Sequence, residues 1–188
     1  MPNYLAALSI LLMIIMVVTR VQMLKRRGIV AMNFGKLDKT DFLIPPFALF
    51  YFYTIFAAAF HLPSVSRQIF FRSNLIAWIG VLFCFAGVAL MLWSLVSFGQ
   101  SFRVGIDVEH PDKLITNGAF GFSRNPIYVA FGCFLIGQFL VFPNWVLLIF
   151  LVAGIWLFNR QILREEDFLK QHYGKEFLEY CKRVRRYL

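Results

Sequence analysis

Five apolar blocks divide this sequence, and they constrain its fold more than any other feature. They cover residues 4–23, 42–62, 74–98, 127–142 and 145–158. An α-helix rises about 1.5 Å per residue, so about 20 residues cross the hydrocarbon core of a bilayer. The first three blocks are long enough to span it. Only Pro143 and Asn144 separate the two short last blocks, which predicts a tight helical hairpin that spans a thinned bilayer or enters it in part.

The composition excludes a soluble domain. The 188 residues are 60% hydrophobic and 15% charged, whereas soluble domains average about 45–50% apolar and 25% charged residues. A core of this size cannot bury the surplus apolar surface, so lipid must cover it. The first block lacks the flanks of a signal peptide, and we expect it to be a retained span. The three cysteines are widely separated, without CxxC spacing, and predict neither disulfides nor a metal site.

Basic residues are distributed unevenly between the predicted loops. With five spanning helices, 17 of the 19 Lys and Arg residues lie on one side, and only Arg67 and Arg72 lie on the other. The positive-inside rule then predicts an outside N-terminus, with the C-terminus and the active site in the cytoplasm. This partition, with contacts to anionic membrane lipids, accounts for the net charge of +9, so we expect no nucleic-acid partner.

Segment 99–128 is polar and contains four glycines, a residue type that lets the backbone approach a ligand closely. It ends with Arg124, Asn125 and Pro126, where Pro126 is predicted to begin a helix and Asn125 to be its N-cap. A helix N-terminus beside an arginine favours a carboxylate ligand. The alternative is a plain surface loop whose asparagine caps the helix, and spacing alone does not decide between the two.

From Arg160 the sequence turns amphipathic, which predicts a helix at the membrane surface. Glu165, Glu166 and Asp167 lie near its start, where carboxylates complement the helix dipole. By helical angle, however, Glu166 falls within the apolar stripe, which indicates a buried and paired carboxylate. Both interpretations stay open on the sequence alone.

Together these segments resemble the superfamily of integral membrane methyltransferases that contains isoprenylcysteine carboxyl methyltransferases and phospholipid N-methyltransferases. The resemblance covers about residues 99–184, and the first two blocks match only as hydrophobic segments. The residues that carry it occur in the order of the family pattern: Leu114-Ile115-Thr116-Asn117-Gly118-Ala119-Phe120, then Arg124-Asn125-Pro126-Ile127-Tyr128, then Glu165-Glu166, then Gly174-Lys175-Glu176-Phe177. We therefore expect an all-α polytopic membrane protein with about five transmembrane helices, a cytosolic cofactor loop and an amphipathic C-terminal helix. Residues 1–98 would form three N-terminal spans, and residues 99–188 the catalytic region.

The resemblance implies a binding site for S-adenosylmethionine. The residues on its adenosine side would be Asp112, Lys113, Leu114, Ile115 and Phe120. Those at its methionine end would be Asn125, Pro126, Ile127 and Tyr128, and the ammonium group would lie at Glu165 or Glu166. Counting back from Gly174 favours Glu165, whereas helical phase favours Glu166. Arg124 and Tyr128 are the candidate catalytic residues: Arg124 would hold a carboxylate of the cofactor or of the acceptor, and the Tyr128 ring would face the sulfonium.

Two positions depart from the family pattern. Asn125 stands where the family has His, and the family's substrate-side Arg falls on Gln161, which leaves Arg160 and Arg164 as candidates for substrate binding. The expected activity is methyl transfer to a lipophilic or lipidated acceptor, first of all an isoprenylcysteine-like carboxylate, which needs no strong general base. Phospholipid N-methylation, methylation of a small thiol and a non-enzymatic membrane protein are the alternatives. A transporter would usually show internal repeats or polar residues at mid-span.

Overall fold

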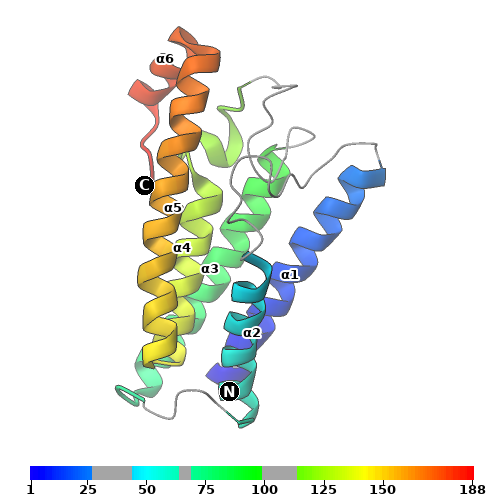
Figure 1. Ribbon diagram of the computed structural model, residues 1–188, viewed down its shortest axis with the longest axis vertical. Coiled ribbons are helices and arrows are strands. Elements are labelled where there is room, and N and C mark those ends of the chain that lie inside the picture. The colour runs from blue at the N-terminus through cyan, green and yellow to red at the C-terminus, as the bar shows by residue number, and fades with distance from the viewer. Residues whose placement is uncertain (27–43, 64–68, 99–113) are drawn as a thin grey trace.

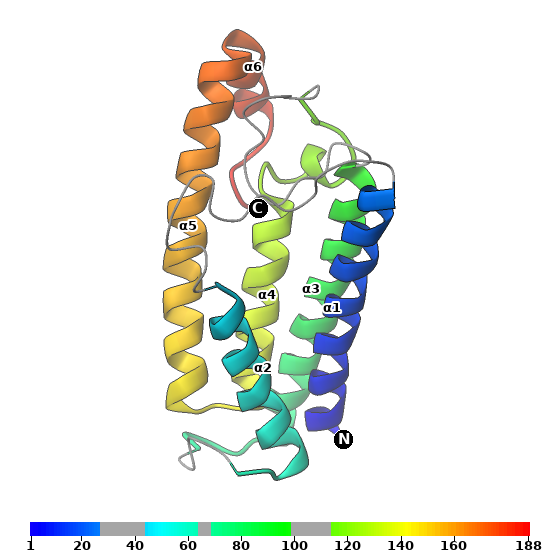
Figure 2. The ribbon, with the colours of Figure 1, turned by 45° about the vertical axis from the view of Figure 1, so that its right-hand side comes forward.

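The computed structural model describes residues 1–26, 44–63, 69–98 and 114–188. Within these ranges the chain has no strand, and its elements are α1 (Pro2–Arg26), α2 (Ile44–Phe60), α3 (Asn74–Phe98), the 3-10 helix η3 (Gly118–Gly121), α4 (Pro126–Val141), α5 (Trp145–Tyr173) and α6 (Lys175–Arg183). The five apolar helices run alternately up and down, so α1, α3 and α5 all end on the side that carries α6 (Figure 1, Figure 2). We call this side the α6 end.

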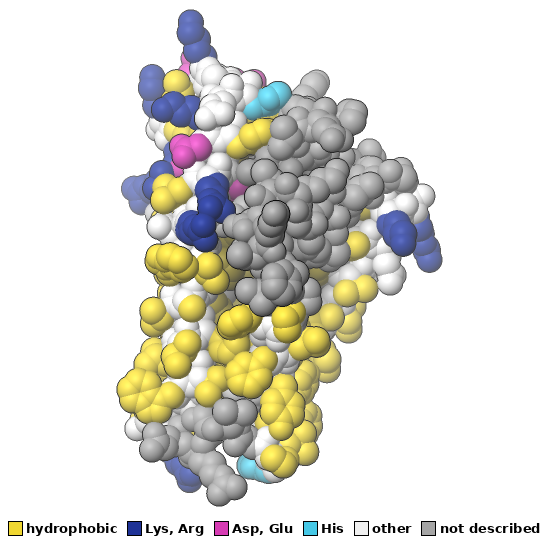
Figure 3. Space-filling model, viewed as in Figure 1, with side chains coloured by type: hydrophobic (Ala, Val, Ile, Leu, Met, Phe, Trp, Pro, Cys, Tyr) yellow, Lys and Arg dark blue, Asp and Glu magenta, His cyan; other side chains and the backbone are white. Residues whose placement is uncertain are grey.

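Three of these helices, α1, α3 and α5, are long and apolar enough to cross a membrane, and α2 and α4 are shorter apolar helices. Large apolar side chains point outward from them, such as Leu82 on α3 and Ile149 on α5. Figure 3 shows hydrophobic side chains over most of the helical body, whereas charged side chains gather toward the α6 end and at the end of α1. The chain is therefore a polytopic helical membrane protein, as its composition predicted.

Helices α4 and α5 form the predicted hairpin. Asn144 caps α5, because its Oδ1 accepts a hydrogen bond from the backbone N–H of Leu147 at 3.0 Å. The predicted end of the last apolar block was wrong as a helix end, because α5 continues without a break through Arg160 to Tyr173 and has 29 residues. No proline or glycine occurs after Gly154 in α5, so nothing breaks the helix where the sequence turns polar.

Glycines let α3 and α4 approach each other closely. A Cβ on Gly80 of α3 would lie 2.7 Å from the carbonyl oxygen of Gly137 on α4, and a Cβ on Gly137 would lie 2.6 Å from the carbonyl oxygen of Gly80. Gly87 meets the carbonyl oxygen of Ala130 in the same way, at 2.8 Å. Small residues allow such backbone contact between helices in a membrane. The helix that begins with the Arg124 motif is thereby held along α3.

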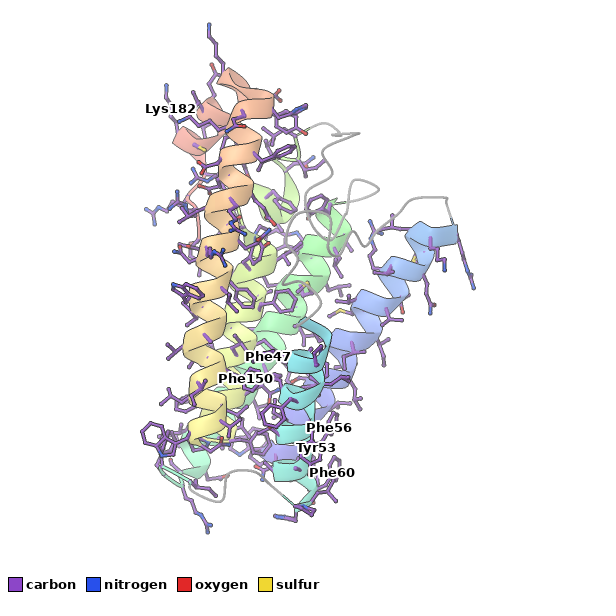
Figure 4. The ribbon with its side chains drawn as sticks, in the orientation of Figure 1. Phe47, Tyr53, Phe56, Phe60, Phe150 and Lys182 are labelled. Atoms are coloured by element: carbon purple, nitrogen blue, oxygen red, sulfur yellow. The ribbon has the colours of Figure 1, made fainter. Side chains whose placement is uncertain are left out.

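The other helices are attached by a buried amide and by aromatic rings. Gln138 of α4 is fully buried, and its Nε2 donates to the carbonyl oxygen of Ala6 at 2.9 Å and to Ser9 Oγ at 3.1 Å, which joins α4 to α1. On the other side, Phe47 of α2 packs against Phe150 of α5 with ring centroids 6.1 Å apart (Figure 4). These contacts join helices that lie far apart in the sequence.

Candidate active site

The turn that contains η3 comes just before the Arg124 motif and lies against the end of α3. Gly118 begins η3 with φ of +59°, a conformation that glycine adopts without strain. A Cβ there would also collide with Ser97, whose hydroxyl accepts a hydrogen bond from the backbone N–H of Ala119 at 3.0 Å. Phe120 is buried edge-to-face against Phe98, with ring centroids 4.9 Å apart. The turn is thus fixed to the C-terminal end of α3.

Asn125 occupies the predicted N-cap position of α4, and Pro126 is the first residue of the helix. The asparagine makes no side-chain capping bond, however. Its Nδ2 donates instead to Glu166 Oε1 at 3.2 Å and to the backbone carbonyl of Arg186 at 3.1 Å. The interpretation of Asn125 as a simple helix cap was therefore wrong, because its amide is used in contacts with α5 and with the end of the chain.

Glu166 lies between two arginines. Nε and Nη2 of Arg124 lie 3.2 and 3.1 Å from Oε1 of Glu166. Nε and Nη2 of Arg186 lie 2.9 and 2.8 Å from its Oε2. The side chains of Arg124 and Glu166 are each 11% exposed, and that of Arg186 is 40% exposed. Two guanidinium groups against one carboxylate leave one net positive charge at the start of α4. Glu166 is the buried, paired carboxylate that its helical phase indicated.

Glu165 contacts a different set of residues. Its Oε1 accepts the hydroxyl of Tyr128 at 2.6 Å and Nε2 of Gln161 at 3.0 Å. The Tyr128 ring lies beside Phe158, with centroids 5.8 Å apart. Neighbouring helix residues point about 100° apart, so the two carboxylates reach different partners. Both lie well inside α5, so the interpretation that they complement a helix N-terminus was wrong.

Helix α6 closes over the turn that precedes α4. It follows Gly174, whose φ of +53° lets the chain change direction after α5. The hydroxyl of Tyr180 donates to the carbonyl oxygen of Phe120 at 2.6 Å, and burial raises its pKa to about 12, so it stays protonated as a donor at neutral pH. A hollow of about 250 Å³ lies between the two segments, lined by Thr116, Gly121, Tyr180, Arg183 and Val184.

The remaining predicted site residues fall in three places. Asp112 and Lys113 lie outside the described residues. Leu114 and Ile115 are half-buried just before η3, and Ile127 packs against the hydrophobic core. Arg160 and Arg164 are exposed on α5, and the guanidinium carbon of Arg160 lies 6.0 Å from the ring centroid of Trp156. The residues that direct contacts bring together are thus Arg124 and Asn125 with Glu166, and Tyr128 with Glu165.

Three residues of this cluster were not expected from the sequence. Gln161 stands four residues before Glu165, a spacing that brings helix side chains together. Tyr180 lies on the apolar face of the predicted C-terminal helix, so its burial could have been predicted from the sequence pattern. Arg186 had no such signal, because it follows the end of α6, where no helical period relates it to Glu166.

The fold and this cluster define a class: a polytopic membrane protein with a buried, charged site at one end of its helices. A family model described as phospholipid methyltransferase matches residues 75–176, which is more than half of the chain. The chain belongs to the phospholipid methyltransferase family, as the resemblance in its motifs indicated. The matched range runs from α3 to the start of α6 and includes both glutamates and the Arg124 motif.

Curated relatives fit this assignment. The chain is similar to a probable protein-S-isoprenylcysteine O-methyltransferase of Oryza sativa subsp. indica, at 29% identity over 112 residues that cover 58% of this chain and 59% of that protein. It is 30% identical over 108 residues to protein-S-isoprenylcysteine O-methyltransferase B of Arabidopsis thaliana, covering 56% and 55%. The Homo sapiens protein-S-isoprenylcysteine O-methyltransferase is 29% identical over 139 residues, covering 70% and 49%. The chain thus spans about half to three-fifths of the length of these relatives. No solved structure matches it significantly.

Proposed function

We propose that this protein is an S-adenosylmethionine-dependent methyltransferase whose acceptor is lipophilic, first of all the carboxylate of an isoprenylcysteine. One observation carries the proposal. The region matched by the methyltransferase family is also the region whose charged side chains are buried together in contact, with Arg124, Asn125 and Glu166 in one group and Tyr128 and Glu165 in the other. The names of the relatives support the isoprenylcysteine acceptor.

The residues of the site fit S-adenosylmethionine. A cofactor with an ammonium group, a carboxylate and a sulfonium needs an acidic partner, a positive partner and an aromatic face. Glu165 supplies a carboxylate that is already oriented by Tyr128 and Gln161. The net positive charge around Glu166 lies at the N-terminus of α4, which favours an anion. Leu114, Ile115 and Phe120, with Asp112 and Lys113, are proposed for the adenosine side.

The geometry further supports different roles for the two glutamates. Both oxygens of Glu166 accept hydrogen bonds from arginine guanidinium groups, so we assign Glu166 to hold Arg124 and the start of α4. The hydrogen bonds that the described residues make to Glu165 converge on Oε1, and we assign its other oxygen as the partner of the cofactor's ammonium group. Arg124 has three nitrogens engaged with Glu166 and with the carbonyl oxygen of Cys181, and we assign it to shape the carboxylate site at α4.

In the proposed reaction the bound cofactor supplies an electrophilic methyl group. The chain's own residues align the reactants and exclude water. The hydroxyl of Tyr128 donates to Glu165, which fixes the tyrosine ring so that one aromatic face can lie beside the cationic centre. An ionised carboxylate acceptor attacks without losing a proton, so the site needs no general base. Arg160 and Arg164, exposed on α5, are proposed to bind acidic groups of the acceptor.

The cytoplasmic side is proposed to be the α6 end. Lys and Arg residues flank the ends of α1 and α5 on this side, and α6 adds more, whereas Arg72 lies at the other end before α3. The positive-inside rule supports an orientation in which α6 and the site face the cytoplasm, from which a soluble cofactor would arrive. The acceptor would then enter from the bilayer.

Phospholipid N-methylation is the second candidate, and the description of the matching family favours it. An amine acceptor must lose a proton, and Glu165 would have to serve as the base. Methylation of a small hydrophobic thiol is a third acceptor class. The three differ in what the site must do, since a carboxylate or thiolate needs no proton removal at the site.

Two measurements test the proposal. Calorimetry of the detergent-solubilised protein should detect S-adenosylmethionine binding, and this binding should weaken in Glu165→Gln. Methyl transfer should then be compared for a prenylcysteine, phosphatidylethanolamine and an alkyl thiol. Transfer to the prenylcysteine alone supports the leading proposal, and transfer to the lipid alone replaces it with the second. A failure to bind S-adenosylmethionine in any of these experiments would contradict the proposal and favour the alternative of a non-enzymatic membrane protein.

A further inference from the structure

The last five residues of the chain, 184–188, lie beyond the region matched by the family and return to the site. We call them the C-terminal tail. The tail leaves α6 in an extended conformation at Val184 and runs back along α5 toward α4 (Figure 2). The carbonyl oxygen of Arg185 accepts the backbone N–H of Arg124 at 2.9 Å, and the hydroxyl of Tyr187 donates to Asn159 Oδ1 at 2.6 Å. The tail is thus attached to both α5 and the start of α4.

We propose that Arg186 is a positioning residue of the site, which acts through Glu166 to hold Arg124 and Asn125 in place. The inference rests on the proposed function. It starts from the division of the Glu166 carboxylate, whose Oε2 receives the two parallel N–H groups of Arg186 and whose Oε1 receives Arg124 and Asn125. Two charge-assisted hydrogen bonds from Arg186 hold Oε2 in place. Because both oxygens belong to one rigid carboxylate, Arg186 limits the rotation that would carry Oε1 away from Arg124 and Asn125.

The contact is also a strong one. Its two N···O distances of 2.9 and 2.8 Å are shorter than the 3.1 and 3.2 Å from Arg124 to the same carboxylate. The hydrogen bond to Glu166 raises the pKa of Arg186 above its ordinary value. Without Arg186, Oε2 of a carboxylate that is 11% exposed would lose its charged partner, and the side chain would turn to find another. Arg124 and Asn125 would lose their fixed acceptor as a consequence.

Asn125 also contacts the C-terminal tail directly. Its amide nitrogen carries two hydrogens and donates to both Glu166 Oε1 and the carbonyl oxygen of Arg186. An imidazole nitrogen carries one hydrogen, so a histidine at this position could not serve both acceptors from one atom. The hydroxyl of Ser123 adds a donor to the same carbonyl oxygen at 3.3 Å. The asparagine and the docked tail therefore form one arrangement.

Steady-state kinetics of the chain of residues 1–188 test this role. Arg186→Gln should raise KM for S-adenosylmethionine at least tenfold with a smaller change in kcat, and Arg186→Lys should recover part of the loss because it keeps the charge but not the fork. Arg185→Gln is the matched control, because the exposed neighbour contacts the site through its backbone carbonyl. Equal kinetic constants for Arg186→Gln and Arg185→Gln would overturn the inference, even if both variants melt at lower temperature.

A double-mutant comparison shows whether Arg186 acts through Glu166. In a Glu166→Gln background, Arg186→Gln should change KM for S-adenosylmethionine by less than twofold, because the route from the tail to Arg124 is already broken. Additive losses would mean that Arg186 acts on its own, which contradicts the inference.

Digestion by a carboxypeptidase tests the docking of the tail independently of the proposed function, because the assay does not require methyltransferase activity. The docked tail should be removed slowly from the unaltered protein and at least tenfold faster from Glu166→Gln. Equal, rapid digestion of both proteins would overturn the docking and the positioning role with it. A tail that depends on Glu166 in a protein that binds no S-adenosylmethionine would overturn the proposed function and the positioning role, and would leave the tail as a structural latch.

Discussion

At the scale of single residues, two neighbouring carboxylates on one helix, Glu165 and Glu166, differ in the groups that they contact. Glu166 has guanidinium groups on both oxygens, so the protein itself supplies its counter-charge. The hydrogen bonds on Glu165 come from the neutral groups of Tyr128 and Gln161. Because the contacts that the described residues make with Glu165 are neutral, its carboxylate is the better site for a cation that arrives with a ligand.

This difference predicts different results for the two glutamine variants. Glu165→Gln should weaken S-adenosylmethionine binding by about 1.5–3 kcal/mol, the range for a charge-assisted hydrogen bond, while the melting temperature changes little. Glu166→Gln should lower the free energy of unfolding by about 2 kcal/mol or more, because it leaves two arginines without a counter-ion. Calorimetry and thermal melting check both. The opposite pattern would exchange the two assignments.

Arg124 gives a second residue-scale prediction. Lysine keeps the charge but cannot reach both Glu166 and the carbonyl oxygen of Cys181 with a planar fork. Arg124→Lys should stay folded and membrane-inserted, with activity at least tenfold lower, which corresponds to about 1.4 kcal/mol in the barrier. A higher KM for S-adenosylmethionine alone would place Arg124 at the cofactor, and a higher KM for the acceptor alone would place it at the substrate. Full activity would show that the site needs only the positive charge of Arg124 and not its planar fork.

The residue-scale predictions from sequence succeeded where a local rule applied. Proline at the first helical position located the start of α4, and helical phase identified Glu166 as buried. The contact between Glu166 and Arg186 could not be predicted from the sequence, because Arg186 lies in a tail that has no helical periodicity. Likewise, the side chain of Asn125 is taken by tertiary contacts that local capping rules do not include.

At the scale of helices, the contact between α3 and α4 determines how rigidly the Arg124 motif is held. Gly137→Ala should destabilise the protein by about 1–3 kcal/mol, because the new methyl group would meet the backbone of Gly80 and of Cys84. Gly132→Ala on the same helix is the matched control, since a Cβ there meets nothing within 4 Å. Thermal melting in detergent should show a loss for the first variant and an equal or higher melting temperature for the second. Equal melting temperatures would mean that the helices can separate without cost.

The helix boundaries show which element-scale features sequence can predict. The block at 74–98 coincides with α3, and the two-residue break at Pro143 and Asn144 coincides with the α4–α5 turn. These limits are marked by helix-breaking or capping residues. The end of α5 was mistaken because the change from apolar to polar residues marks the edge of the membrane and not the end of a helix. Hydropathy measures the surroundings of a helix, whereas its length depends on backbone hydrogen bonds.

At the scale of the whole molecule, the two ends of the helical body differ in charge. Charged side chains gather toward the α6 end (Figure 3). This end combines the ends of α1 and α5 with α6, and the site lies there. The hydrophobic core beneath it takes residues from α1, α2, α3, α4 and α5, such as Ile10, Ile55, Val81, Phe134 and Leu147. The division into an N-terminal region of three spans and a catalytic region from residue 99 stays a prediction.

Orientation in the membrane provides the whole-molecule prediction. Single cysteines can be introduced at Leu62, an exposed residue after α2, and at Lys182, an exposed residue of α6, in a background without the three native cysteines. Helices α3, α4 and α5 lie between these positions, so an odd number of crossings should put them on opposite sides. An impermeant thiol reagent applied to intact cells should label Leu62→Cys, and should reach Lys182→Cys only after the membrane is opened, because the basic α6 end is retained in the cytoplasm. Labelling of both positions from outside would refute the five-span topology, and labelling of Lys182→Cys alone would reverse it and place the site on the side that a cytosolic cofactor does not reach.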